Sequence, residues 1–162
     1  MSRKVEIKKS LLKDTDMDGL FAKREFKVTI PPTVICNYDG VKVHKDVYTQ
    51  PDYNRDYVMG LDKDYAIDAI DPYSSLGRYI NDPIYKKKAN CRLSIKRNKT
   101  MVIIPTKNIQ IGDELYLSYG DFYWQDVDKF DRLSSEHQQY LYNNAGDELL
   151  EYLDYYYEMV NT

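Results

Sequence analysis

SSLGRYINDP at residues 74–83 and GDELYLSYGDFYW at residues 112–124 are two dense clusters of aromatic and polar side chains. Neither places a nucleophile beside a histidine, and the chain has no glycine-rich phosphate loop or dinucleotide fingerprint. The usual sequence signals of hydrolytic, nucleotide-binding and redox enzymes are therefore missing. The meaning of the two clusters depends on what surrounds them.

The length of 162 residues, without any Gly/Ser-rich linker, predicts one compact domain. No uncharged apolar run has membrane-spanning length, and MSRKVEIKKS at the N-terminus lacks the apolar core of a secretory signal. We therefore expect an intracellular protein without a membrane partner. The net charge of −3 gives no argument for direct nucleic-acid binding and suits a basic protein or peptide better.

Cysteine and histidine are too rare to predict a metal site. The chain has two of each, Cys36, Cys91, His44 and His137, and their spacing is not that of metal ligands. Two reduced thiols, at least one of them buried, are the simpler interpretation. No metal is expected.

Residues 14–25, DTDMDGLFAKRE, match the calcium loop of an EF-hand, with aspartates at alternate positions, a glycine and Glu25 as the twelfth residue. An EF-hand loop needs a helix on each side. The sequence that follows, FKVTIPPTVICNY, is rich in β-branched residues and contains a Pro-Pro pair, which a helix does not tolerate. Calcium binding through residues 14–25 is therefore kept as a remote alternative.

Short runs of β-branched and aromatic residues predict strands through the first two-thirds of the chain. They lie at residues 5–7, 20–22, 26–30, 33–38, 41–44, 57–61, 65–70, 91–96, 101–104 and 114–119. Turn residues at 62–64 and 98–99 join neighbouring runs, so residues 57–70 and 91–104 are expected to form hairpins.

The last third changes to a helical pattern. Ser135 and Gln138 predict a capping box for a helix that ends near residues 143–146. A second helix is expected from Asp147, with apolar side chains at helical spacing on one face. The predicted fold class is mainly β (α+β), with several small sheets and a C-terminal helical appendage.

The order of the motifs resembles that of the SET-domain family of protein lysine methyltransferases, from about Val5 to Trp124. MDGLFA at residues 17–22 is similar to the Gly-x-Gly-x-hydrophobic-Ala motif with which that family begins. YDG at residues 38–40 resembles its Tyr-x-Gly. YVMGLDKDYAIDA at residues 57–69 resembles the hairpin that precedes the cofactor site.

The two opening clusters complete the resemblance. LGRYINDP, followed by ANC at residues 89–91, is similar to Arg-Phe-Ile-Asn-His-Ser and Pro-Asn-Cys, and GDELYLSYGD is similar to Gly-Glu-Glu-Leu and Tyr-Gly. The blocks look especially like those of nucleosomal monomethyltransferases and of small viral SET proteins. Each block is weak alone, and the ordered set carries the resemblance.

This resemblance implies that residues 1–130 form a SET-like catalytic domain in which the two clusters pass one through the other as a pseudoknot, an exception to the usual rule against threading. S-adenosylmethionine would bind on one face, and lysine would enter through a narrow channel from the other. Residues 131–162 would form helices packed on this domain. They would replace the family's three-cysteine zinc segment and close one wall of the channel.

The same resemblance assigns roles to individual residues. Tyr119 would be the catalytic residue, and Asn81 would hold the ammonium group of the cofactor. The other implied cofactor-binding residues are Met17, Asp18, Gly19, Tyr57, Arg78, Tyr79, Asp82, Tyr123 and Trp124. The substrate channel would be lined by Tyr65, Ala66 and Leu117.

Three positions depart from the family pattern. Met17 stands where the first glycine is usual, and Asp82 replaces a common histidine. Leu117 occupies a position where a Phe or Tyr often governs how many methyl groups are added. The number of methyl groups therefore does not follow from the sequence.

The leading hypothesis is an S-adenosylmethionine-dependent protein lysine N-methyltransferase that acts on a basic, histone-like tail. The nucleus, including a host nucleus, is the favoured location, with the cytoplasm as the alternative. The viral resemblance adds a homodimer as an expected state. A second hypothesis, motivated by Met17 and Asp82, is a SET-like module that binds a peptide or partner and has weak or no catalytic activity.

Overall fold

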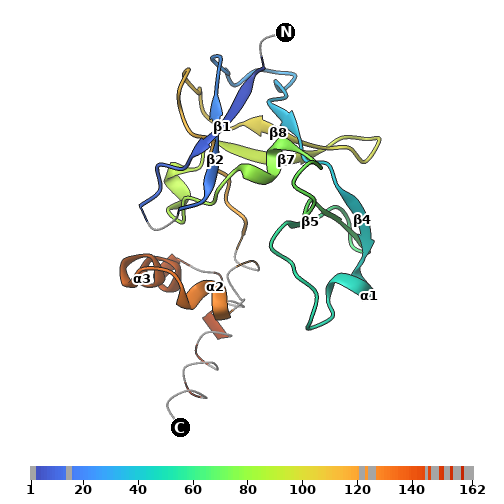
Figure 1. Cartoon of the computed structure of the whole chain (residues 1–162), viewed down its shortest axis with the longest axis vertical. Coiled ribbons are helices and arrows are strands. Elements are labelled where there is room, and N and C mark those ends of the chain that lie inside the picture. Colours follow the sequence, from blue (N-terminus) through green and yellow to red (C-terminus); the bar gives the residue numbers. More distant parts are fainter. Residues whose placement is uncertain are drawn as a thin grey trace.

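The computed structural model describes residues 3–13, 16–120, 123, 127–144, 146, 150, 151, 154 and 158. Its strands form small antiparallel sheets, and the longest described helix lies toward the C-terminal end (Figure 1). The predicted fold class, mainly β with C-terminal helices, is confirmed. No helix in the described residues combines the length and the apolar character needed to cross a membrane.

The described strands form three sheets. In the first, β1 (Val5–Lys9) pairs with β2 (Asp18–Ala22). In the second, the order is β3 (Cys36–Asn37), β8 (Met101–Pro105) and β7 (Cys91–Ile95). In the third, the order is β4 (Val41–His44), β6 (Tyr65–Asp68) and β5 (Val58–Gly60).

The helical elements are short. The α-helices are α1 (Lys45–Tyr48), α2 (Val127–Asp131) and α3 (Ser135–Asn144), and the 3₁₀ turns are η1 (Leu76–Tyr79) and η2 (Lys86–Lys88). In Figure 1, α2 and α3 lie together, apart from the β4–β6–β5 sheet. Beyond α3, the described residues 150, 151, 154 and 158 are helical. The predicted start of the second helix, Asp147, and most of its apolar face lie outside the described residues.

Residues 80–84, which include the end of SSLGRYINDP, lie beside residues 114–119 of GDELYLSYGDFYW. Asn81 forms a parallel bridge with Tyr116, and the Leu117 amide donates to the Asn81 carbonyl at 3.0 Å. Asn90 adds a second link, because its side-chain amide donates to the Glu114 carbonyl at 2.9 Å and accepts from the Tyr116 amide at 2.8 Å. A pseudoknot requires this contact between the two segments. The passage of one segment through the loop formed by the other stays a prediction.

The main core lies where the sheets meet this pair of segments. Its most deeply buried side chains are Leu20, Phe26, Ile80, Ile103, Ile109 and Leu115. A second, smaller cluster joins Ile84 to Phe130 of α2 and Leu141 of α3. The C-terminal helices therefore pack on the segment that follows Asn81.

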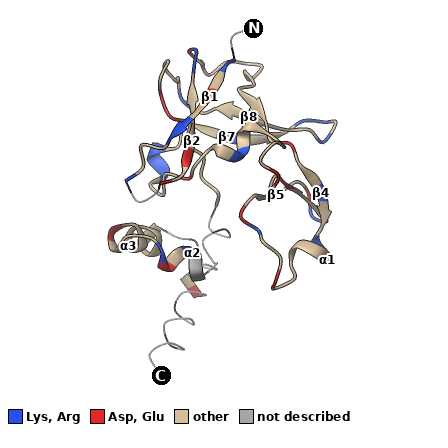
Figure 2. Cartoon of the chain, in the orientation of Figure 1, with Lys and Arg blue, Asp and Glu red and all other residues tan. Residues whose placement is uncertain are grey.

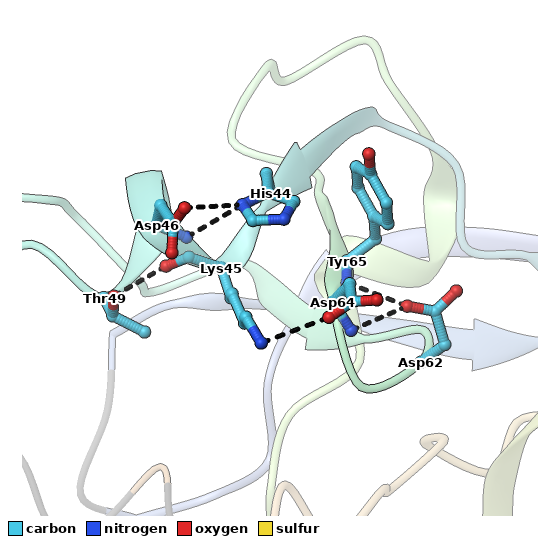
Figure 3. A network of polar contacts seen from close by, with 7 residues as sticks. All are labelled: His44, Lys45, Asp46, Thr49, Asp62, Asp64 and Tyr65. Atoms are coloured by element: carbon cyan, nitrogen blue, oxygen red, sulfur yellow. Dashed lines mark hydrogen bonds and ion pairs between the residues drawn. The ribbon is translucent and has the colours of Figure 1, made fainter.

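Both predicted hairpins are present, as β5–β6 and β7–β8. Within the first, the Asp62 carboxylate accepts the amides of Asp64 and Tyr65 at 2.9 and 2.8 Å (Figure 3). These two hydrogen bonds lower the pKa of Asp62, since they favour its charged form. Lys45 at the start of α1 pairs with Asp64 at 3.1 Å and so ties this turn to β4.

Other predictions were wrong in detail. Residues 26–30 form one isolated bridge, Phe26 with Ile109, instead of a strand, and only Cys36–Asn37 of residues 33–38 is a strand. Helices α1 and α2 were not expected. The N-cap of α3 is Ser134, whose hydroxyl accepts the His137 amide at 3.2 Å, one residue earlier than predicted.

Gly40, in the predicted Tyr-x-Gly motif, is required by a close approach of two backbones. A Cβ at this position would lie 2.1 Å from the Asp68 carbonyl oxygen, whereas a Cβ on Gly60 would meet nothing within 4 Å. A side chain at residue 40 would therefore push β4 away from the end of β6.

We expect Gly40→Ala to lower the free energy of unfolding by about 2 kcal/mol, because the added carbon overlaps backbone. At about 2–4 °C for each kcal/mol, this lowers Tm by roughly 6 °C. Gly60→Ala is the matched control and should stay within about 0.5 kcal/mol of the parent. Urea unfolding followed by circular dichroism measures both, and equal stability of the two variants would contradict the close approach.

Candidate functional site

One cleft, with a volume of about 550 Å³, lies between the strand body and the C-terminal helices. It is lined by nine residues that the sequence predicted for the site, namely Met17, Asp18, Tyr57, Arg78, Tyr79, Asn81, Asp82, Tyr119 and Tyr123. Gly19 is buried directly beside it in β2. Trp124 lies outside the described residues.

Tyr119 is held by three contacts. Its hydroxyl donates to the Ile80 carbonyl at 2.5 Å, and its amide donates to the Asp82 carboxylate at 2.9 Å. Its ring meets the ring of Tyr123 edge-on, with the centroids 4.7 Å apart. Burial raises the pKa of the Tyr119 hydroxyl well above its ordinary value, and the negative charges that Tyr123 and Asp82 can carry raise it further. The hydroxyl therefore stays neutral at physiological pH.

Asn81 joins the cleft to the β1–β2 hairpin. Its side-chain amide donates to the Asp18 carbonyl at 3.0 Å, and the residue is 9% exposed. The Oδ1 atom of Asn81 accepts no hydrogen bond from the described residues. A buried acceptor beside the Asp18 backbone suits a cationic donor group.

Glu114 is a site residue to which the sequence assigned no role. Its buried carboxylate accepts the Ser10 hydroxyl and the Leu11 amide, both at 2.7 Å. It also accepts the Tyr116 hydroxyl at 3.1 Å. A Cβ on Gly19 would lie 2.5 Å from Glu114 Oε2, so the glycine that the motif shares with the family lets this carboxylate approach. Glu114 thus anchors the loop that borders the cleft.

Arg78 builds one aromatic wall of the cleft. Its guanidinium carbon lies 4.1 Å from the ring centroid of Tyr57 and 4.9 Å from that of Tyr79. Its N–H groups donate to the carbonyls of Ala69 at 2.8 Å and Ile70 at 3.1 Å. Because these contacts use the guanidinium, Arg78 holds the two rings in place.

The C-terminal helices also line this cleft, whereas the sequence predicted them at a wall of the lysine channel and named none of their residues. Lys129 of α2 pairs with Asp56 at 2.9 Å and lies 4.1 Å from the ring centroid of Tyr123. Arg132, Leu133 and His137 also line the cleft. No motif marks these residues, because their position depends on how the helices pack. Closure of the lysine channel by these helices stays a prediction.

The three predicted channel residues do not line this cleft. Ala66 and Leu117 are buried in the core. Tyr65 is half-buried, and its ring contacts His44 edge-on and lies 4.4 Å below the Lys42 ammonium. A lysine channel on the far side of Tyr119 therefore stays a prediction from the resemblance.

The calcium interpretation of residues 14–25 was wrong about the local fold. Asp18–Ala22 of this stretch form β2, which pairs with β1, whereas an EF-hand loop lies between two helices. Asp16 pairs instead with Lys9 at 3.1 Å, and Asp14 lies outside the described residues. Within the described residues, no group of three His, Cys, Asp or Glu side chains is arranged to hold a metal.

Residues 18–120 match the SET domain model, which covers more than half of the chain, and the chain therefore belongs to the SET-domain family. It is 34% identical over 68 residues to the N-lysine methyltransferase KMT5A of Xenopus tropicalis and, with the same figures, to KMT5A-A of Danio rerio. Each alignment covers 40% of this chain and 19% of the relative.

Solved structures show the same fold. A humanized mutant of the Chaetomium thermophilum Polycomb Repressive Complex 2, bound to the inhibitor GSK126, is similar with a TM-score of 0.61 and 25% identity. That match covers 75% of this chain and 15% of the other. The complex ctPRC2 in an autoinhibited conformation, bound to S-adenosylmethionine, matches with a TM-score of 0.59 and 24% identity over 75% of this chain and 16% of the other. The chain therefore spans less than a fifth of the length of these relatives.

We expect Glu114→Ala to lower the free energy of unfolding by about 3 kcal/mol, because the Ser10 hydroxyl and the Leu11 amide lose their buried acceptor. Glu136→Ala is the control, since its carboxylate is exposed and accepts a hydrogen bond from the Tyr85 hydroxyl at 2.5 Å. It should cost less than about 1 kcal/mol. Urea unfolding compares the two, and similar losses would refute the anchoring role of Glu114.

Proposed function

We propose that this chain is an S-adenosylmethionine-dependent protein lysine N-methyltransferase. The observation that carries the proposal is that the Tyr119 hydroxyl and the Asn81–Asp18 pair border one cleft in a chain of the SET-domain family. The activity is the one named for the KMT5A relatives. S-adenosylmethionine is the methyl donor that SET domains use, and the ctPRC2 structure binds it.

The cleft fits this cofactor in size and in chemistry. A volume of about 550 Å³ is within the range of pockets that bury a ligand of this size. Asn81 Oδ1 and the backbone at Asp18 would hold the ammonium group. The aromatic rings of Tyr57, Tyr79 and Tyr123 would contact the flat base and the cationic sulfonium.

When bound, S-adenosylmethionine supplies an electrophilic methyl group carried by a sulfonium. The task of the protein is then to align a neutral lysine amine with that group and to exclude water. Tyr119 would orient the amine through its neutral hydroxyl, and the Ile80 carbonyl beside it adds a second oxygen. Buried apolar residues such as Ala66 and Leu117 would favour the uncharged amine, because burial disfavours its charged form.

A basic, histone-like tail is the substrate class that we infer. The net charge of −3 suits a basic partner. Acidic residues lie at the start of β2 and in the loop before β5 (Figure 2), but on the cleft Asp56 is paired with Lys129, so the inference rests on the net charge of the chain. A histone substrate would place the chain in the nucleus, which we propose as its location. A host nucleus and a homodimer follow only from the viral resemblance.

The departures at Met17 and Asp82 support a second candidate, a SET-like module that binds a peptide without transferring methyl groups. The Met17 side chain is 55% exposed and lines the cleft where the family has a glycine. A bulky side chain at the mouth of the cleft would hinder the cofactor.

We expect calorimetry to detect binding of S-adenosylmethionine, and we expect radiolabelled methyl groups to reach core histones. Tyr119→Phe should reduce kcat by about 100-fold and leave cofactor affinity within a factor of about three, because only the orienting hydroxyl is lost. Tyr73→Phe, at a surface tyrosine that is 97% exposed, is the control. Cofactor binding without transfer on a broad protein panel would favour the binding module, and no cofactor binding would refute the proposed function.

The pH dependence provides a separate test. We expect kcat to rise from pH 7 to pH 10, because the substrate lysine, with a pKa of about 10.4 in solution, loses its proton. Ionisation of Tyr119 should not lower kcat over this range, because burial raises the pKa of its hydroxyl and keeps it neutral. Tyrosinate absorbance should therefore show no Tyr119 ionisation below pH 10 when the parent is compared with Tyr119→Phe. Ionisation of Tyr119 near pH 9 would contradict the expectation.

A further inference from the structure

Asp82 forms a clamp between two backbone amides. Its Oδ1 accepts the Ile84 amide at 2.7 Å, and its Oδ2 accepts the Tyr119 amide at 2.9 Å. The residue is buried, so water competes weakly for either bond, and hydrogen bonds to a carboxylate are stronger than bonds between neutral groups. The turn at residues 82–84 is thereby tied to the backbone of Tyr119.

The same segment also holds the side chain of Tyr119. The hydroxyl donates to the Ile80 carbonyl, two residues before Asp82. The carbonyl of Asn81, which lies between Ile80 and Asp82 in the chain, accepts the Leu117 amide. Because the ring and the amide of Tyr119 both contact residues 80–82, a shift of this segment moves the hydroxyl.

Ile84 shows that the turn is under strain. Its φ is 65°, in the left-handed region that a β-branched residue rarely adopts. Such a conformation persists where the surroundings hold it. Here the side chain of Ile84 is buried against Phe130 of α2 and Leu141 of α3. The two C-terminal helices therefore hold the far end of the Asp82 clamp.

We propose that Asp82 is a positioning residue for Tyr119, and that packing of α2 and α3 on Ile84 keeps the Asp82 clamp in place. The proposal rests on the proposed function for its kinetic test. The aspartate that replaces the family's common histidine then has a function of its own, because a carboxylate offers one acceptor oxygen to each of two amides. It also makes the C-terminal helices a support of the catalytic residue.

Asp82→Asn is the central variant, because a carboxamide has a single acceptor oxygen and satisfies one of the two amides. With Tyr119 displaced, kcat should fall by between about 10-fold and 100-fold, and KM for a histone peptide should change by less than about threefold. Asp113→Asn is the matched control. Its carboxylate accepts the Gln110 amide at 2.9 Å on an exposed turn that does not line the cleft.

Hydrogen exchange of the Tyr119 amide gives a readout that needs neither cofactor nor activity. In ¹⁵N-tyrosine-labelled protein, the signals come from the 17 tyrosines, and loss of one signal in Tyr119→Phe assigns that amide. Exchange at Tyr119 should be at least about tenfold faster in Asp82→Asn, because we expect the single carboxamide oxygen to keep the local bond to Ile84, two residues away, and so to leave the Tyr119 amide without its buried acceptor. It should be unchanged in Asp113→Asn. Equal exchange in the parent and in Asp82→Asn would overturn the clamp.

Leu141→Ala tests the support from the helices, with Leu141→Val in its place where circular dichroism shows that the alanine variant is unfolded. If both changes act through the same turn, the loss of kcat in the double variant Asp82→Asn/Leu141→Ala should be smaller than the product of the two single losses. If the loss of kcat in the double variant equals the product of the two single losses, the two changes act independently, and the proposed support of the Asp82 clamp by the helices is overturned.

The outcomes separate the inference from the proposed function. A parent protein that transfers no methyl group refutes the function, and the hydrogen-exchange comparison still decides whether Asp82 holds Tyr119. An active parent with unchanged kcat in Asp82→Asn refutes the positioning role alone.

Discussion

The parallel contact between residues 80–84 and 114–119 is the constraint on which the rest of the structure depends. It fixes Asn81 against Tyr116 and Leu117, and it brings Tyr119 over the Ile80 carbonyl. Two walls of the cleft are attached to these segments: the β1–β2 loop through Glu114, and the C-terminal helices through Ile84.

The fold was predictable where local sequence determines local structure. The hairpins at residues 57–70 and 91–104 combine β-branched runs with turn residues, and both form. Residues 26–30 have the same composition but form no strand, because only Phe26 pairs, in an isolated bridge with Ile109. Helices α1 and α2, of four and five residues, are too short to leave a periodic pattern. These errors arise because the strand and helix propensities of single residues do not say which segments will pair in the folded chain.

The candidate site was predictable where a motif marks it and not where packing creates it. Asn81, Asp82 and Tyr119 belong to ordered blocks, and the structure gathers them around one cleft. Lys129 belongs to no block and reaches the cleft only because α2 packs beside Tyr123. Glu114 lies inside a block, but its role depends on a partner, Ser10, that no pattern connects to it.

The contact between Ser10 and Glu114 spans 104 positions of the chain. During synthesis, the β1–β2 loop leaves the ribosome before its buried acceptor, Glu114, has been made. The cleft is therefore completed late, and a chain that stops before Glu114 exposes an unfinished loop to proteases. Contacts of such high sequence separation also slow folding.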